Sequence, residues 1–320
     1  MPDFTPHTLR LLFTTLKAKN YTFQTFAQFL KDPAPRTIVL RHDVDARKMN
    51  SLRTAQLEKE LGITGTYNFR IVPASYNEDV ISQISAFGHE IGYHYEDLAM
   101  AVSALKGQGT RDKGQGRKGE VLYEMAIKSF EKNLEILRRI VPVETICMHG
   151  SPLSKYDNRK LWERYNYRDF GVIGEPYFDV DFRKVLYLTD TGRRWDGERV
   201  SVRDKVGEGR FKKEDSRRDQ GQGTPSFAEA TAGKRDKEEN QVYNIQHETY
   251  NLQPTTYNLS NQFHSTFNII HAAYNNLLPN QIMITIHPQR WDDRPWPWIR
   301  ECVWQNVKNV GKRILVKKEG

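Results

Sequence analysis

The sequence predicts an α/β fold in which mostly parallel strands form a distorted (β/α) barrel. Short apolar segments alternate along the chain with longer amphipathic ones, which is the pattern of parallel strands joined by helical crossovers. Several apolar segments become polar at their C-terminal ends, as in IVLRHDVD at 38–45 and MITIHPQR at 283–290. In parallel α/β folds these ends gather on one face, where binding sites are built. We therefore expect a site at that face.

The expected elements alternate in order along the chain. Apolar residues at helical spacing predict a first helix near the N-terminus. Gly62 and Gly88 are expected to end the second and third helices, because glycine adopts a positive φ without strain. The expected strands are 37–43, 64–71, 90–95, 144–150, 170–174, 185–190 and 281–287. The expected helices are 6–31, 47–61, 77–87, 119–140, 158–165, 264–278 and 297–310.

The composition predicts one barrel domain that carries two insertions. Only 38% of the 320 residues are hydrophobic, which is low for a packed domain of this length. Two segments, 106–119 and 203–262, are rich in charged, Gly and Gln residues. The second ends in a seven-residue Tyr-Asn repeat, and Pro254 within it argues against a coiled coil. We expect both segments to be disordered loops within a single domain spanning 1–320.

Charge and cysteine content narrow the class of protein. The net charge is +8, but half of this excess lies in 106–118, so a solvated loop accounts for it and no nucleic-acid partner is expected. Cys147 and Cys302 lack CxxC spacing, which argues against a disulfide framework and a cysteine-based zinc site. No apolar run is long enough to span a bilayer and no export signal is recognisable, so we expect a soluble, cytoplasmic protein.

Two aspartates end the first expected strand. Side chains two apart on a strand point to the same face, so Asp43 and Asp45 should enter one cavity. Two carboxylates at such a short distance repel each other unless a cation or a proton lies between them. The alternative is that Asp45 caps the helix that follows, which would leave Asp43 unexplained.

Three histidines follow the apolar parts of three other strands. His94 ends EIGYH, His149 lies in MHGSP, and His287 lies in IHPQRW. His89 is five residues before His94, so it should face the other way and have a structural role. Imidazole and carboxylate are the usual ligands of Zn²⁺ or a similar divalent ion in catalytic sites, so the set predicts a metal centre.

The order of these motifs resembles the polysaccharide deacetylase family, the NodB-homology domain of carbohydrate esterase family 4. GHEIGYH at 88–94 is the most specific motif and IHPQRW at 286–291 is moderately specific. The resemblance covers about 36–300 without the insertions. It implies a distorted barrel, a divalent metal, and removal of N-acetyl groups from sugars. We expect the metal to be zinc, with cobalt, nickel or manganese as alternatives.

The resemblance also implies roles for single residues. Asp43 matches the general base, and Asp45 matches the metal-binding aspartate. His94 matches the first metal-binding histidine, and His287 matches the late histidine that acts as general acid. The general acid would protonate the departing amine after water has attacked the acetyl carbonyl.

One position departs from the family pattern. A second metal-binding histidine is expected four residues after the first, where this chain has Leu98. Glu96 or Asp97 could replace it, and so could His149 from the neighbouring strand. We favour His149. The Arg-Pro-Pro-like motif of the family is also missing from that strand, which carries HGSP instead.

Residues near the expected site are candidates for binding an N-acetylated sugar or glycan. Asp190, Arg194 and Trp195 lie in TDTGRRWDG at the end of another strand, and the alternative role for Asp190 is to orient a catalytic partner. Arg290 and Trp291 follow His287. Tryptophan faces commonly stack on sugars, which is why these positions suit a glycan.

Two rival functions remain open. The chain could be a catalytically impaired relative that binds glycan or a partner, an interpretation that Leu98 motivates. It could also be another metal-dependent hydrolase that acts on amides or phosphate esters. Metal analysis together with acetate release would separate these functions.

Overall fold

The computed structural model describes residues 2–107, 115–150, 157–195 and 263–318, without the side chains of 107, 115–118 and 307–318. The predicted insertion 203–262 therefore lies outside the described residues. The predicted insertion 106–119 overlaps two helices at its ends, and 108–114 lie outside the described residues.

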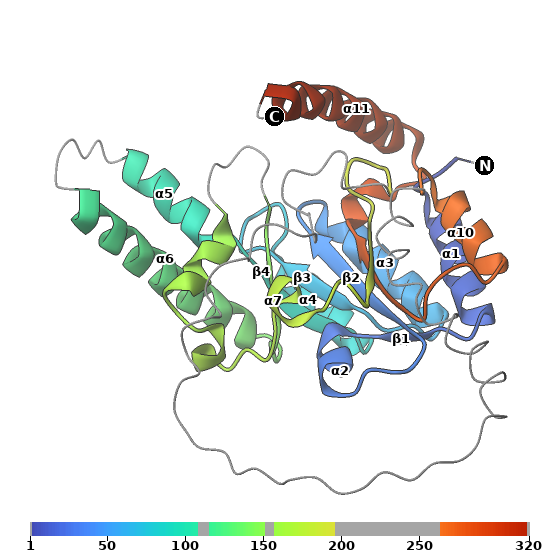
Figure 1. Ribbon diagram of the computed structural model, residues 1–320, viewed down its shortest axis with the longest axis horizontal. Coiled ribbons are helices and arrows are strands. Elements are labelled where there is room, and N and C mark those ends of the chain that lie inside the picture. Colours follow the sequence, from blue (N-terminus) through green and yellow to red (C-terminus); the bar gives the residue numbers. More distant parts are fainter. Residues whose placement is uncertain (1, 108–114, 151–156, 196–262, 319–320) are drawn as a thin grey trace, which may run out of the picture.

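The strands form one parallel sheet with the order β5-β4-β3-β2-β7-β6, and the short β1 pairs with the first half of β2 (Figure 1). Their bounds are β1 Thr22–Gln24, β2 Thr37–Val44, β3 Thr66–Phe69, β4 Glu90–Tyr95, β5 Ile146–Met148, β6 Leu186–Thr189 and β7 Gln281–Ile286. The α/β class and the parallel sheet are confirmed. Within the described ranges the sheet is a curled half-barrel, because no strand joins β5 to β6.

Helices connect the strands and cover the outer face of the sheet (Figure 1). The α-helices are α1 Pro6–Ala18, α2 Phe26–Lys31, α3 Lys48–Glu60, α4 Glu78–Ala86, α5 Asp97–Gly107, α6 Gln115–Arg138, α7 Pro176–Asp179, α10 Thr266–Tyr274 and α11 Pro295–Lys318. The 3₁₀ helices are η1 Asn158–Glu163, η2 Tyr167–Phe170 and η4 Pro288–Arg290. Gly62 and Gly88 follow α3 and α4 with φ of 62° and 92°, as expected.

Three elements differ from the prediction. The segment 6–31 forms two helices with β1 between them, because Asn20 takes a positive φ of 63° and Thr25 starts a new helix with a capping box. The strand predicted at 170–174 is absent; Gly174 makes only an isolated bridge to Thr145. The helix α5 was not predicted.

The hydrophobic core lies between the sheet and its helices in two main clusters. One joins α1 and α10 to β2, β6 and β7, and includes Leu12, Phe13 and Ile284. The other joins α4 and α6 to β3, β4 and β5, where buried Phe130 meets Trp162 at a ring distance of 4.8 Å. These contacts stabilise the strands on the face of the sheet that the helices cover. The carboxyl ends of the strands can therefore carry polar residues.

Candidate metal centre

The site lies at the carboxyl ends of β2, β4, β5 and β7. Asp43 is in β2 and Asp45 comes directly after it. His94 is in β4, while His149 and His287 follow β5 and β7. Asp45 does not cap α3, because the helix begins at Lys48 and Arg47 occupies the N-cap position.

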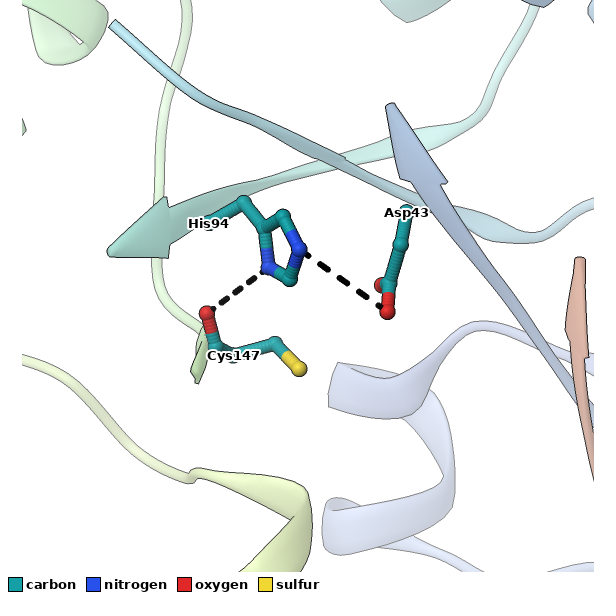
Figure 2. Close-up of side chains that lie close together, drawn as sticks. All are labelled: Asp43, His94 and Cys147. Carbon is teal, nitrogen blue, oxygen red and sulfur yellow. Dashed lines mark hydrogen bonds and ion pairs between the residues drawn. The ribbon is translucent and has the colours of Figure 1, made fainter. Parts of the chain in front are cut away.

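His94 is oriented by the backbone of the neighbouring strand. Its Nδ1 lies 3.0 Å from the carbonyl oxygen of Cys147. A carbonyl only accepts, so Nδ1 carries the proton in the neutral ring and Nε2 keeps a lone pair. Nε2 lies 3.4 Å from Asp45 Oδ1 and 3.9 Å from Asp43 Oδ2. Figure 2 shows the ring between Cys147 and Asp43. Metal-binding histidines are typically held in this way.

His149 brings a second imidazole to the same point. Its backbone N–H donates to the Tyr95 carbonyl at 2.9 Å, which continues the contact between β4 and β5. Its Nδ1 lies 3.1 Å from Asp45 Oδ1 and 3.2 Å from His94 Nε2. The three residues predicted as metal ligands therefore converge, with ligand atoms all within 4.8 Å of one another.

The spacing of these three atoms fits a divalent ion. In a tetrahedral zinc site with bonds of about 2.0–2.1 Å, neighbouring ligand atoms are about 3.3–3.4 Å apart. The separations among Asp45 Oδ1, His94 Nε2 and His149 Nδ1 are 3.1, 3.2 and 3.4 Å. Among the described residues, Asp45 Oδ1 is also buried without a hydrogen-bond partner, a costly state for a carboxylate oxygen. Two imidazoles and one carboxylate leave a fourth position open, as in catalytic zinc sites.

Asp45 is further held by donors around the site. Gln289 Nε2 donates to its Oδ2 at 3.1 Å, which leaves Oδ1 directed at the two histidines. Burial opposes the charge on this carboxyl, but His149 and His94 outweigh burial and hold the pKa of Asp45 well below its ordinary value. The carboxylate is therefore ionised and ready to bind a cation at neutral pH.

Asp43 is clamped by an arginine from its own strand. Arg41 donates from Nε to Oδ1 at 2.9 Å and from Nη2 to Oδ2 at 2.5 Å, and Asn68 Nδ2 donates to Oδ1 at 3.2 Å. Burial would raise the pKa of Asp43, yet Arg41 and His94 hold it well below its usual value. A carboxylate held in this way stays ionised but is a weak proton acceptor. Asp43 as the general base remains a prediction.

A second set of possible ligands shares His94. Asp43, His94 and Cys147 also offer atoms within 4.8 Å of one another (Figure 2). In this set Asp43 is already bound by both arms of Arg41, whose positive charge also opposes a cation there. The set that contains Asp45 is therefore the better metal site.

His287 approaches Asp45 Oδ2, whereas the two other histidines approach Asp45 Oδ1. Its Nδ1 is 2.6 Å from Asp190 Oδ1, and its Nε2 is 3.9 Å from Asp45 Oδ2. Asp190 also accepts hydrogen bonds from Arg290 Nη1 at 2.6 Å and from Trp291 Nε1 at 2.7 Å. Burial alone would raise the pKa of Asp190, but Arg290 and His287 lower it by more than burial raises it. The pKa of Asp190 therefore lies below its ordinary value. An ionised Asp190 thus fixes the His287 ring with Nε2 toward the site.

Most of the predicted sugar-binding residues have other roles here. Asp190 is fully buried, and Arg290, which is 9% exposed, is paired with it. Trp291 and Trp195 are 3% and 1% exposed and lie in the core against Phe4. These contacts give the four side chains orienting and packing roles, and their contact with substrate stays a prediction. The alternative that Asp190 orients a catalytic partner agrees with its contacts.

The remaining candidates are placed clearly. Arg194 is half-buried in the turn before Trp195, and its contact with substrate stays a prediction. Leu98 is buried in the core. Asp97 accepts from Tyr93, Ser129 and Asn133 outside the metal centre. Glu96 is closer, since its Oε2 lies 3.9 Å from His149 Nε2, while Arg70 donates twice to its Oε1.

The opposite face of the sheet carries a separate polar cluster. His42 Nε2 is 2.8 Å from Glu58 Oε1, Tyr67 donates to Glu58 Oε2 at 2.8 Å, and the Gly65 N–H donates to His89 Nδ1 at 3.1 Å. These side chains are buried behind β2. As expected, His89 has a structural role.

Sequence reasoning missed Arg41, Asn68 and Gln289. The signal for Arg41 and Asn68 was their spacing: Arg41 is two residues before Asp43 on one strand, and Asn68 is opposite Asp43 in the register of β3. Nothing in the sequence indicated that Gln289 reaches back to Asp45.

Comparisons with known proteins add no family to this description. No protein-family model, curated protein or solved structure matches the chain. Within the part of the chain that the structure describes, no helix is both long and apolar enough to cross a bilayer.

Proposed function

We propose that the protein is a metal-dependent hydrolase that removes an N-acetyl group from an amino sugar of a glycan or a glycan precursor. The observation that supports this most is the spacing of Asp45 Oδ1, His94 Nε2 and His149 Nδ1, which suits a zinc-like ion with one open position. The choice of an acetamido sugar follows from the resemblance of GHEIGYH and IHPQRW to the deacetylase motifs. A barrel-like architecture of that family is part of the same proposal.

In this proposal Asp45, His94 and His149 hold the ion. A divalent ion bound there supplies Lewis-acid polarisation of the amide carbonyl and lowers the pKa of a nearby water. Asp43 accepts the proton of the attacking water at Oδ2. Among the residues that the structure describes, Oδ2 accepts a hydrogen bond from Arg41 alone, whereas Oδ1 accepts from Arg41 and Asn68. Arg41 and Asn68 position this carboxylate.

His287 is the proposed proton donor to the leaving amine. Asp190 binds its Nδ1, so the proton that can be transferred is on Nε2, the nitrogen that faces Asp45. An ionised carboxylate behind an imidazole stabilises the imidazolium and fixes the ring orientation. The proposed base and the proposed acid each lie 3.9 Å from one of the proposed metal ligands, His94 and Asp45 respectively, which suits addition of water followed by departure of an amine.

Metal content and acetate release test the proposal together. Purified protein should contain about one divalent ion per chain, and His94→Ala should lose it, while His271→Ala should keep it because His271 is exposed on α10. The metal-loaded protein should release acetate from N-acetylated amino-sugar oligomers, and a chelator should stop the release. Absence of metal from the wild type would refute the proposed site.

A catalytically impaired relative is the second candidate. It is favoured by the two hydrogen bonds that Arg41 donates to Asp43, because they make this carboxylate a weak proton acceptor. The two candidates differ in one result. An impaired relative binds the metal through the same residues but releases no acetate from any acetamido sugar. Release of a different carboxylic acid would instead indicate another metal-dependent amide hydrolase.

A further inference from the structure

Glu96, which directly follows β4, carries a carboxylate that the proposed chemistry does not use. Arg70, which directly follows β3, donates to its Oε1 from Nε at 2.8 Å and from Nη2 at 2.6 Å. The other oxygen, Oε2, lies 3.9 Å from His149 Nε2. The side chains of Glu96 and His149 are both 13% exposed, so little water competes for these contacts. One carboxylate therefore joins an arginine to a proposed metal ligand.

The backbone of His149 is fixed from two sides. Its N–H donates to the Tyr95 carbonyl at 2.9 Å, and its own carbonyl accepts from Asn158 Nδ2 at 2.9 Å. Asn158 Oδ1 in turn accepts from the Ala99 N–H of α5 at 2.9 Å. These bonds bring the ring to the metal centre, but they do not decide which ring nitrogen keeps a lone pair. A neutral imidazole has one N–H and one lone pair, and only the lone pair can bind an ion.

The metal centre requires the lone pair of His149 on Nδ1. This atom lies 3.1 Å from Asp45 Oδ1 and 3.2 Å from His94 Nε2, while Nε2 faces Glu96. An ionised carboxylate accepts and does not donate, so Glu96 favours the proton on Nε2 and the lone pair on Nδ1. A carboxylate in this position also makes the imidazole a stronger ligand. The contact at 3.9 Å is longer than a hydrogen bond, and we expect it to shorten when a cation binds at Nδ1.

Glu96 is poorly placed to bind the ion itself. Among the described residues, it belongs to neither group whose ligand atoms lie within 4.8 Å of one another. Its Oε1 is held by Arg70, and its Oε2 approaches Nε2 of His149 and not Nδ1. The same guanidinium donates from Nη1 to the backbone carbonyl of Asp45 at 3.3 Å. Arg70 thus links the segment that carries Asp45 to the carboxylate that faces His149.

We propose that Glu96, held by Arg70, is a positioning residue that fixes the His149 ring with Nδ1 toward the ion. This role rests on the metal centre of the proposed function and deepens it. Both neighbours of Glu96 are donors: the guanidinium of Arg70 and the Nε2–H of His149. Only a side chain with two accepting oxygens satisfies both, so glutamine cannot replace glutamate at this position.

The zinc affinity of the full chain and the visible absorption of bound Co²⁺ test the proposal. Glu96→Gln, which keeps the shape of the side chain, should bind zinc about 10–100-fold more weakly in competition with a chelator. In a His149→Gln background the same change should have no further effect, because Glu96 acts through the ring that is absent there. Bound Co²⁺ should keep its absorption in Glu96→Gln, since no ligand is lost. Glu135→Gln removes an exposed carboxylate that pairs with an arginine on α6, and this control should bind zinc like the wild type.

Three results would overturn the positioning role and leave the metal centre standing. The first is unchanged zinc affinity in a folded Glu96→Gln variant. The second is an equal further loss in the His149→Gln background, which would give Glu96 a role independent of that ring. The third is altered Co²⁺ absorption in Glu96→Gln, which would make Glu96 a ligand. A wild type that binds no zinc would instead refute the metal centre and this role with it, so the two failures are distinguishable.

Discussion

The Arg41–Asp43 pair offers the sharpest test of the polar interior behind the site. Arg41 is 1% exposed and Asp43 is 3% exposed, and the two share two hydrogen bonds. Replacement of Arg41 by Met keeps the length of the side chain but leaves a buried carboxylate without its cation. Removal of one partner of a buried ion pair costs about 3–5 kcal/mol. Because the free energy of unfolding of a small domain is about 5–15 kcal/mol, Arg41→Met should remove a large part of the stability at neutral pH.

The loss should depend on pH in a defined direction. In the wild type, the folded-state pKa of Asp43 lies below its unfolded value, so the carboxylate stabilises the fold above about pH 4 and this contribution is lost as the pH falls. Without Arg41, burial is the main influence on this carboxyl and raises its pKa above the unfolded value. The variant then loses stability as the pH rises. The difference between variant and wild type should be larger near pH 8 than near pH 5.

Urea unfolding of the chelator-treated proteins measures this difference without any contribution from metal. The double variant Arg41→Met/Asp43→Asn removes both charges, so it should recover most of the stability that the single variant loses. The reasoning would be refuted by a loss of the same size at both pH values together with no recovery in the double variant. That outcome would mean that the cost comes from altered packing and not from an uncompensated charge.

Three further predictions concern the site. His149→Gln should weaken zinc binding by more than about 100-fold in equilibrium dialysis, since it removes one of three ligands, and unchanged affinity would exclude His149. Gly92→Ala should lower the free energy of unfolding of the metal-free protein by about 1–3 kcal/mol in urea. The new Cβ would lie 2.2 Å from Asn68 Oδ1 and would displace the Asn68 amide from its acceptor, Asp43 Oδ1. An equal loss in an Asn68→Ala background would contradict this cause. Asp190→Asn should lower kcat for acetate release at least about a hundredfold through misorientation of His287 while metal content stays constant, and loss of metal would point to a structural role instead.

The strand ends could be predicted because polar residues interrupt apolar runs there. Asp45, His94 and His149 each follow such a run, and parallel topology alone brings these ends together. The choice of His149 over Glu96 or Asp97 also followed from this argument, and the structure brings His149 to the other two.

The partner of Arg41 and the burial of the tryptophans could not be predicted because they depend on side-chain packing. The spacing of Arg41 places it on the same strand face as Asp43 and Asp45, but it does not show which of the two carboxylates pairs with it. Trp195 and Trp291 have the composition of a sugar-binding surface, but the first residues of the chain, including Phe4, cover them. Such coverage joins segments far apart in the sequence, and no local pattern reports it.

The open sheet has a cover over one end of its interior, although it does not close into a barrel within the described residues. The short helix α2 covers the end of the interior opposite the metal centre, and its exposed backbone groups pair with the inner face of the sheet. Phe26 N–H donates to Thr66 Oγ1 at 2.7 Å, and Ala27 N–H donates to Glu90 Oε2 at 2.9 Å. Burial raises the pKa of Glu90, although its side chain is partly exposed. Because charges interact more strongly away from bulk water, we expect the cover that α2 provides to strengthen the contacts that hold Asp43, which is 3% exposed at the other end.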